Sequence, residues 1–113
     1  MEDGRPQQVA LRLTYRGRTL ERRREKDAIS LGRGEECGIV VADQNASRQH
    51  CTIERRKDKF VLIDVSTNGT YVTVEGEKEV LLQREEFVLR KRGSITFGTP
   101  LVKAAEGVEF DVE

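Results

Sequence analysis

The sequence shows no long helical periodicity and is built instead from short apolar alternations separated by glycine and polar turns. In the first of these, Val9, Leu11, Leu13 and Tyr15 alternate with small or polar residues, a period of two that is typical of a half-buried strand. Further strands are predicted at residues 18–26, 28–31, 38–41, 50–55, 60–63, 71–74, 79–82, 87–89, 94–97 and 107–112. About ten or eleven short strands at this spacing predict an all-β fold, an antiparallel β-sandwich.

Three segments carry more specific expectations. Residues 18–26 contain one aliphatic residue, Leu20, so they lack the apolar stripe of a helix, and we expect a solvent-facing strand that pairs back in a hairpin. Residues 60–63 form a continuous apolar run between turn signals, which indicates a strand buried on both faces. Residues 91–93, with a glycine at the end, are expected to form a turn.

The length of 113 residues indicates one domain. We expect it to span residues 8–113, after a flexible N-terminal tail at residues 1–7. No apolar run approaches the length of a membrane span, and the first residues lack the apolar core of a secretory signal. These features predict a cytoplasmic protein that does not enter the membrane.

Charge is balanced overall, with 20 basic and 20 acidic residues. A net charge of zero argues against nucleic acid as a partner, because such binding depends on phosphate neutralisation, and against a polybasic membrane-binding surface. Locally the charge is uneven: residues 16–26 hold six bases and two acids, and residues 104–113 hold four acids and no base. Such runs are typical of solvated faces.

The few cysteine and histidine residues limit the chemistry of the chain. Cys37 and Cys51 do not form a C-x-x-C pair, and with one histidine they cannot complete a zinc site, so no metal and no cofactor is expected. Both cysteines are predicted to be small buried apolar residues, with a disulfide between them left open. A catalytic triad through Ser47 and His50 is poorly founded, because neighbours three apart at a strand start do not face each other. We therefore expect a binding protein and not an enzyme.

Three loops are rich in hydrogen-bond donors: residues 32–34, 47–50 and 67–70. They supply guanidinium groups, hydroxyls, an amide and glycine backbone, with few acids among them, which suits an oxyanion. In a sandwich the loops cluster at the two ends and carry function. Each loop alone also has a simpler interpretation: Gly32 and Gly34 as turn residues, Asn68–Gly69 as a hairpin turn, and His50 as a structural histidine.

Taken in order, the three loops resemble the forkhead-associated (FHA) family. Its pattern of G-R, S-x-x-H and N-G-T is matched by Gly32–Arg33, by Ser47 with His50, and by Asn68–Gly69–Thr70. Arg33 and Ser47 are 14 positions apart, and Ser47 and Asn68 are 21 apart. With the flanking strands, the likeness covers nearly the whole chain. It implies a β-sandwich that binds phosphothreonine peptides.

The resemblance also implies a role for nine loop residues. The residues expected to bind the phosphopeptide are Arg33, Ser47, Arg48, Thr67 and Asn68. Arg33 and Ser47 would contact the phosphate, Arg48 would add a third contact, and Thr67 and Asn68 would flank the peptide. The residues expected to be structural within these loops are Gly32, His50, Gly69 and Thr70.

A finer likeness, in residues 62–72 and 87–98, is to FHA domains attached to bacterial class III adenylate or guanylate cyclases. The chain carries no cyclase catalytic residues, so it cannot make a cyclic nucleotide alone. Two hypotheses follow. The first is a non-catalytic signalling adaptor that recognises phosphothreonine in a partner protein or in its own parent chain. The alternative is a phosphate-independent or autoinhibitory domain that docks on a cyclase domain of a larger enzyme.

Overall fold

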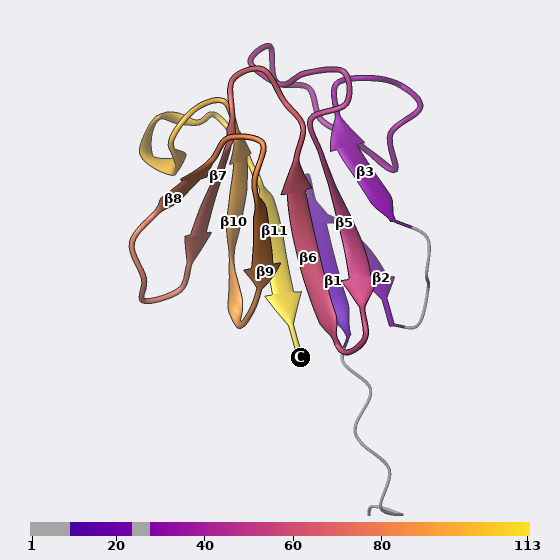
Figure 1. Ribbon diagram of the computed structural model, residues 1–113. Coiled ribbons are helices and arrows are strands. Elements are labelled where there is room, and N and C mark those ends of the chain that lie inside the picture. Colours follow the sequence, from indigo (N-terminus) through magenta and orange to yellow (C-terminus); the bar gives the residue numbers. More distant parts are fainter. Residues whose placement is uncertain (1–9, 24–27) are drawn as a thin grey trace, which may run out of the picture.

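A computed structural model describes residues 10–23 and 28–113, and these residues form two sheets packed face to face (Figure 1). The strands are β1 (Leu11–Tyr15), β2 (Arg18–Arg22), β3 (Ile29–Gly32), β4 (Ile39–Val40), β5 (Cys51–Arg56), β6 (Lys59–Asp64), β7 (Thr70–Val74), β8 (Val80–Leu82), β9 (Glu86–Leu89), β10 (Arg92–Phe97) and β11 (Val108–Val112), with a short 3-10 helix, η1 (Leu101–Lys103). The prediction of an all-β sandwich is therefore confirmed.

The first sheet has six strands in the order β2-β1-β11-β10-β7-β8, and the second has five in the order β4-β3-β5-β6-β9. The predicted first hairpin is confirmed: β2 pairs antiparallel with β1, with Leu20 opposite Leu13. Arg16 and Gly17 join them with φ values of 52° and 79°, and two positive φ values in a two-residue loop suit the right-handed twist of the strands. The strand ends at Arg22, and residues 24–26 of the predicted segment lie outside the described residues.

The core lies between the two sheets and follows the alternation of the sequence. In β1, Leu11 and Leu13 are fully buried, whereas Arg12 between them is exposed. The residues that share this inner position in the other main strands are Ile29, Leu31, Cys51, Ile53, Phe60, Leu62, Val72, Val74, Ile95, Phe97, Val108 and Phe110. Val61 is buried as well, as expected for a strand covered on both faces. Cys37 and Cys51 are buried free thiols, so the disulfide left open by the sequence is not formed.

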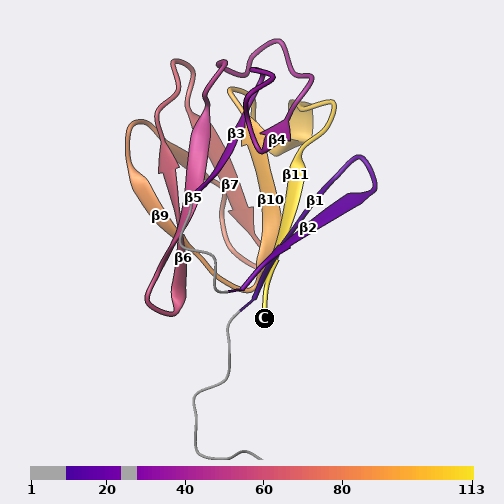
Figure 2. The same cartoon turned by 90° about the vertical axis from the view of Figure 1, so that its right-hand side faces the viewer.

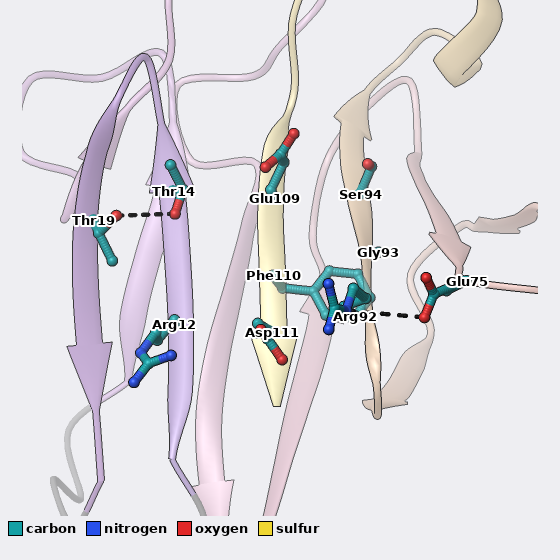
Figure 3. Close-up of a pocket in the computed structure, with 10 residues that line it drawn as sticks. All are labelled: Arg12, Thr14, Thr19, Glu75, Arg92, Gly93, Ser94, Glu109, Phe110 and Asp111. Atoms are coloured by element: carbon teal, nitrogen blue, oxygen red, sulfur yellow. Dashed lines mark hydrogen bonds and ion pairs between the residues drawn. The ribbon is translucent and has the colours of Figure 1, made fainter. Parts of the chain in front are cut away.

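The outer face of the six-stranded sheet is polar. It carries a hollow of about 430 Å³ lined by residues such as Arg12, Thr14, Arg92 and Glu109 (Figure 3). Thr14 and Thr19 share a hydrogen bond across β1 and β2 there. No helix in the described part of the chain is long and apolar enough to cross a membrane.

Two local expectations need correction. The segment predicted at residues 38–41 is only two residues long as a strand, and β4 pairs in parallel with β3, so the sandwich is mostly but not wholly antiparallel. The turn predicted at residues 91–93 is wrong, because β10 already begins at Arg92 and the positive φ falls on Lys91. Gly93 lies inside the strand: a Cβ there would come within 2.0 Å of the Thr73 carbonyl oxygen. That glycine marks a close approach of two strands and not a turn.

The expected tail at residues 1–7 lies outside the described residues.

Candidate functional site

The three donor-rich loops meet at one end of the sandwich, the upper end in Figure 1. They follow β3, precede β5 and join β6 to β7. Hydrogen bonds tie each loop to the next, so residues far apart in the sequence form one surface.

Arg33 is bonded to the loop that precedes β5. Its backbone N–H donates to the Ser47 carbonyl at 2.8 Å, and its side-chain Nε donates to the Ala46 carbonyl at 3.0 Å. These two bonds hold the guanidinium beside Ser47, and it forms no ion pair with an acid of residues 10–23 and 28–113. A guanidinium held in this way keeps a planar pair of donors for an anion.

Ser47 connects this loop to the one between β6 and β7. Its Oγ accepts a hydrogen bond from the Thr67 backbone N–H at 3.1 Å. The hydroxyl oxygen is used as an acceptor, so its own proton is left to donate. Beside it, the Asn68 side-chain Nδ2 donates to the Asn45 carbonyl at 3.2 Å. Arg33, Ser47 and Asn68 thus belong to a single bonded unit.

His50 is fully buried beneath this unit and bonds to two loops at once. The Ser47 backbone N–H donates to Nδ1 at 3.0 Å, so the ring proton resides on Nε2, which donates to the Gly69 carbonyl at 2.8 Å. The ring also packs edge-on against Phe97, with 5.1 Å between centroids. The imidazole must be neutral to accept the bond from Ser47.

Asp64 is a buried carboxylate whose importance the sequence analysis missed. Its Oδ1 accepts hydrogen bonds from the hydroxyls of Ser66 and Thr70, each at 2.6 Å, and its Oδ2 accepts from the Arg84 backbone N–H at 2.8 Å. The Ser66 Oγ in turn accepts from the Gly69 N–H at 2.8 Å. The sequence does contain a signal for this role. Asp64 is a single acid at the end of the apolar run 60–63, and it directly precedes a loop rich in serine and threonine.

Burial raises the pKa of Asp64, but the hydrogen bonds donated by Arg84, Ser66 and Thr70 outweigh that effect and hold the pKa below its usual range. The carboxylate is therefore ionised at neutral pH. An ionised acceptor inside the protein gives stronger hydrogen bonds than a neutral one. The loop that carries Thr67 and Asn68 is fixed from below by this charge.

Two glycines allow the binding loops to lie close to neighbouring segments of the backbone. A Cβ on Gly32 would lie 2.3 Å from the Arg48 carbonyl oxygen, so no side chain fits where β3 meets the next loop. Gly69 has a φ of 90° and accepts a hydrogen bond from the Gly98 N–H at 2.9 Å. Thr70 is fully buried at the start of β7.

Arg48 takes a different place from the other expected phosphate ligands. Its side chain is 69% exposed, and its Nη2 lies 3.4 Å from the Glu36 Oε1. Gln49 donates to the other oxygen of Glu36 at 3.5 Å. A backbone hydrogen bond and the Gln49 side chain lower the pKa of Glu36, which keeps a negative charge beside Arg48.

The family follows from comparison with known domains. A model of the FHA domain matches residues 29–98. This chain belongs to the FHA family. No curated protein matches it.

Solved FHA domains share the fold. The FHA-1 domain of Mycobacterium tuberculosis Rv1747 is 20% identical with a TM-score of 0.71, over 94% of this chain and 98% of that chain. The FhaA FHA domain, solved in complex with the intracellular domain of Rv3910, is 27% identical with a TM-score of 0.62, over 93% and 99%. The MEK1 FHA domain, solved with the HOP1 pThr318 peptide, is 22% identical with a TM-score of 0.68, over 91% and 96%.

Replacing the buried carboxylate should destabilise the domain. Asp64→Ala leaves the hydroxyls of Ser66 and Thr70 and the Arg84 N–H without their acceptor, and each buried unsatisfied group costs about 1–3 kcal/mol. We expect the free energy of unfolding, measured with urea, to fall by about 3 kcal/mol. Asp58→Ala, an exposed turn residue, is the control and should change it by less than about 0.5 kcal/mol. Equal losses in the two variants would contradict the assigned role of Asp64.

Acidification should lower the free energy of unfolding of the domain because of His50. Burial lowers its pKa from 6.5, more than the Gly69 hydrogen bond and the carboxylates of Asp64 and Asp43 raise it. The unfolded chain therefore takes up a proton first as the pH falls below about 6.5. The free energy of unfolding should be level above that pH and decrease below it, with a slope approaching about 1.4 kcal/mol per pH unit.

Urea unfolding at pH 7.5 and 5.5 measures this decrease, and His50→Gln is the control that should show no decrease between these two values. As the sequence has one histidine, an NMR titration of its ring is unambiguous. A ring pKa of 6.5 or higher in the folded domain would refute the prediction.

Proposed function

We propose that this FHA domain is a phosphothreonine-peptide-binding module that acts as a signalling adaptor without catalysis. The observation that carries this function is the bonded unit of Arg33, Ser47 and Asn68, which presents unused donors from three loops at one surface. A phosphate group has about −1.5 to −2 charge and three acceptor oxygens at neutral pH, which matches those donors.

The energy of such contacts is adequate for specific binding. A hydrogen bond to a charged group contributes about 1.5–3 kcal/mol, so two or three bonds from Arg33 and Ser47 contribute about 3–9 kcal/mol before ordering costs. Micromolar affinity requires about 8 kcal/mol. The phosphate supplies a large share, and contacts of Asn68 and Thr67 with the peptide backbone supply the rest. Recognition then depends on the phosphate and is not merely enhanced by it.

Solved relatives support this function. The MEK1 FHA domain was solved with a phosphothreonine peptide, and the FhaA FHA domain with the intracellular domain of another protein. The same fold with its loops at one end makes a phosphothreonine-containing peptide or protein the natural partner of this chain.

Arg48 would join the phosphate contacts only by leaving Glu36. Its ion pair is exposed and 3.4 Å long, and such pairs contribute little to stability, so a doubly charged phosphate can replace the carboxylate. His50, by contrast, is not available as a general base, since both ring nitrogens bond to the backbone of the binding loops. This supports a binding role and not a hydrolytic one.

A narrower hypothesis concerns the larger protein to which the domain belongs. The likeness of residues 62–72 and 87–98 to cyclase-attached FHA domains supports a parent enzyme that contains a nucleotide cyclase, and a cytoplasmic location goes with it. In that setting the domain could instead dock on its cyclase neighbour without phosphate. Mutation of Arg33 separates phosphate-dependent binding from phosphate-independent docking. Only the phosphate-dependent function needs that side chain, so only that function is lost on mutation.

The decisive experiment compares a phosphothreonine peptide with its unphosphorylated twin by calorimetry, for the wild type and two variants. Arg33→Ala should weaken binding of the phosphopeptide by at least about tenfold to a hundredfold, which corresponds to the loss of one charge-assisted bond. Arg92→Ala, which changes an exposed arginine on the outer face of the six-stranded sheet, should leave binding unchanged. The best phosphopeptide is first selected from an oriented phosphothreonine library. Equal affinity for the two twins, or an unaffected Arg33→Ala variant, would overturn the proposed function.

A further inference from the structure

Two arginines reach the binding loops and are anchored to them in the same way. The Nε of Arg33 donates to the Ala46 carbonyl, and the Nε of Arg84 donates to the Ser66 carbonyl at 3.2 Å. Arg84 lies in the connection between β8 and β9, which Figure 1 and Figure 2 show at the end of the sandwich that carries the binding loops. The phosphate contacts described above do not use it.

The position of Arg84 is fixed at two points. Its backbone N–H donates to the Oδ2 of Asp64 at 2.8 Å, and its side chain is bonded to Ser66, two residues further along the same loop. The guanidinium is therefore held beside the β6–β7 loop before any ligand arrives. An arginine that is already ordered loses little conformational entropy when it binds a ligand.

The charge of Arg84 is not neutralised by the domain itself. The residue is exposed, and it forms no ion pair within the part of the chain that the structure describes. The carboxylate of the adjacent Glu85 accepts instead the backbone N–H of Gln83 at 3.0 Å. Because the bond to the loop uses only the Nε, the donors of both terminal amino groups are left for an anion.

A single peptide unit links Arg84 to the phosphate-binding residues. The Thr67 N–H donates to the Ser47 Oγ at 3.1 Å, and the Ser66 carbonyl of the same unit accepts the bond from Arg84 at 3.2 Å. The N–H and C=O of a trans peptide point in opposite directions, so Ser47 and Arg84 lie on opposite sides of this loop.

The distance between the two sides suits a short stretch of extended chain. The two hydrogen bonds and the peptide unit between them place the Arg84 Nε within about 9 Å of the Ser47 Oγ. An extended chain advances about 3.3–3.6 Å per residue. A ligand whose phosphate is bound at Ser47 therefore carries its second or third neighbouring residue to Arg84, across the exposed Thr67.

We propose that Arg84 binds a second negatively charged side chain of the phosphopeptide, two or three residues away from the phosphothreonine. This proposal rests on the proposed function, because the phosphate bound by Arg33 and Ser47 sets the position of the peptide. The second group is a carboxylate or another phosphate, since the planar donors of a guanidinium match both. The ligand class is thus a phosphothreonine segment with a second anionic residue.

A purely structural Arg84 makes a different prediction. If its bond to Ser66 only holds the loop, replacement of Arg84 weakens every phosphopeptide by the same factor. If Arg84 contacts an anion, replacement weakens only those peptides that carry the second charge. The ratio between the affinities of charged and neutral peptides therefore separates the two roles.

The test begins with a phosphothreonine peptide library that is random at four positions on each side, selected on the wild-type domain. We expect aspartate or glutamate to be enriched at a position two or three residues from the phosphothreonine. Three peptides are then compared by calorimetry, with glutamate, phosphothreonine or glutamine at that position. The two charged peptides should bind about fivefold or more tightly than the neutral one, and less so as sodium chloride is added. Their mutual ratio shows whether a carboxylate or a second phosphate is preferred.

Two variants and a control assign the effect to Arg84. In Arg84→Gln, whose amide can still donate to the Ser66 carbonyl, the charged peptides should lose their advantage of about fivefold, while the neutral peptide keeps its affinity within about twofold. Arg84→Glu should reverse the order, so that the neutral peptide binds best. Arg92→Gln, which changes an exposed arginine at the start of β10, should leave all three affinities unchanged.

Two results would overturn the proposal and leave the proposed function intact. They are equal affinity of the wild type for the three peptides, and equal weakening of all three by Arg84→Gln, each with phosphopeptide binding that still requires Arg33. The first uses the wild type alone, so it decides the matter even if a variant does not fold. Failure of the proposed function looks different: no peptide then binds more tightly than its unphosphorylated twin, and the role of Arg84 is refuted together with it.

Discussion

A single buried carboxylate supports the functional end of the molecule. Asp64 accepts bonds from Ser66 and Thr70, and Ser66 passes the connection to the Gly69 N–H. The Gly69 carbonyl is bonded from the other side by His50. The loop between β6 and β7 is therefore held on one side by the Asp64 carboxylate and on the other by the neutral imidazole of His50.

This arrangement separates the groups that build the site from those that meet a ligand. His50, Asp64 and Thr70 are buried, and their polar atoms bond to the protein itself. Arg33 and Ser47 each use part of their bonding capacity to fix their position and keep the remainder for an anion. Donors that are already ordered lose little conformational entropy on binding. For a flexible arginine, that loss of entropy is the main cost of binding a ligand. The buried hydrogen bonds of His50, Asp64 and Thr70 thus keep the donors of Arg33 and Ser47 in place for a ligand.

Local patterns in the sequence were sufficient for the fold, because the period of two and the turn residues act within a few positions. The first hairpin and the buried run of β6 are examples. Contacts set by tertiary structure were not accessible. The place of Gly93 within a strand and the pairing of Arg48 with Glu36 depend on segments that are not adjacent in sequence, and the parallel pairing of β4 depends on how the loop after β3 turns back. Donor-rich composition marks the three loops, and the order of their motifs indicates the family, but the sequence does not show that Asp64 organises one of them.

The four edge strands, β2, β8, β4 and β9, are protected from further strand pairing in different ways. At β9, the exposed carboxylate of Glu86 pairs with Arg56 at 2.8 and 3.0 Å. At β8, Glu79 accepts the Leu101 N–H, which holds η1 close to that edge. At β4 the strand is only two residues long. The edge strand β2 is five residues long, and its Arg18 and Leu20 line an aliphatic hollow together with Val40. Charged side chains on an edge strand oppose pairing with a further strand, and this protects a sandwich from edge-to-edge association.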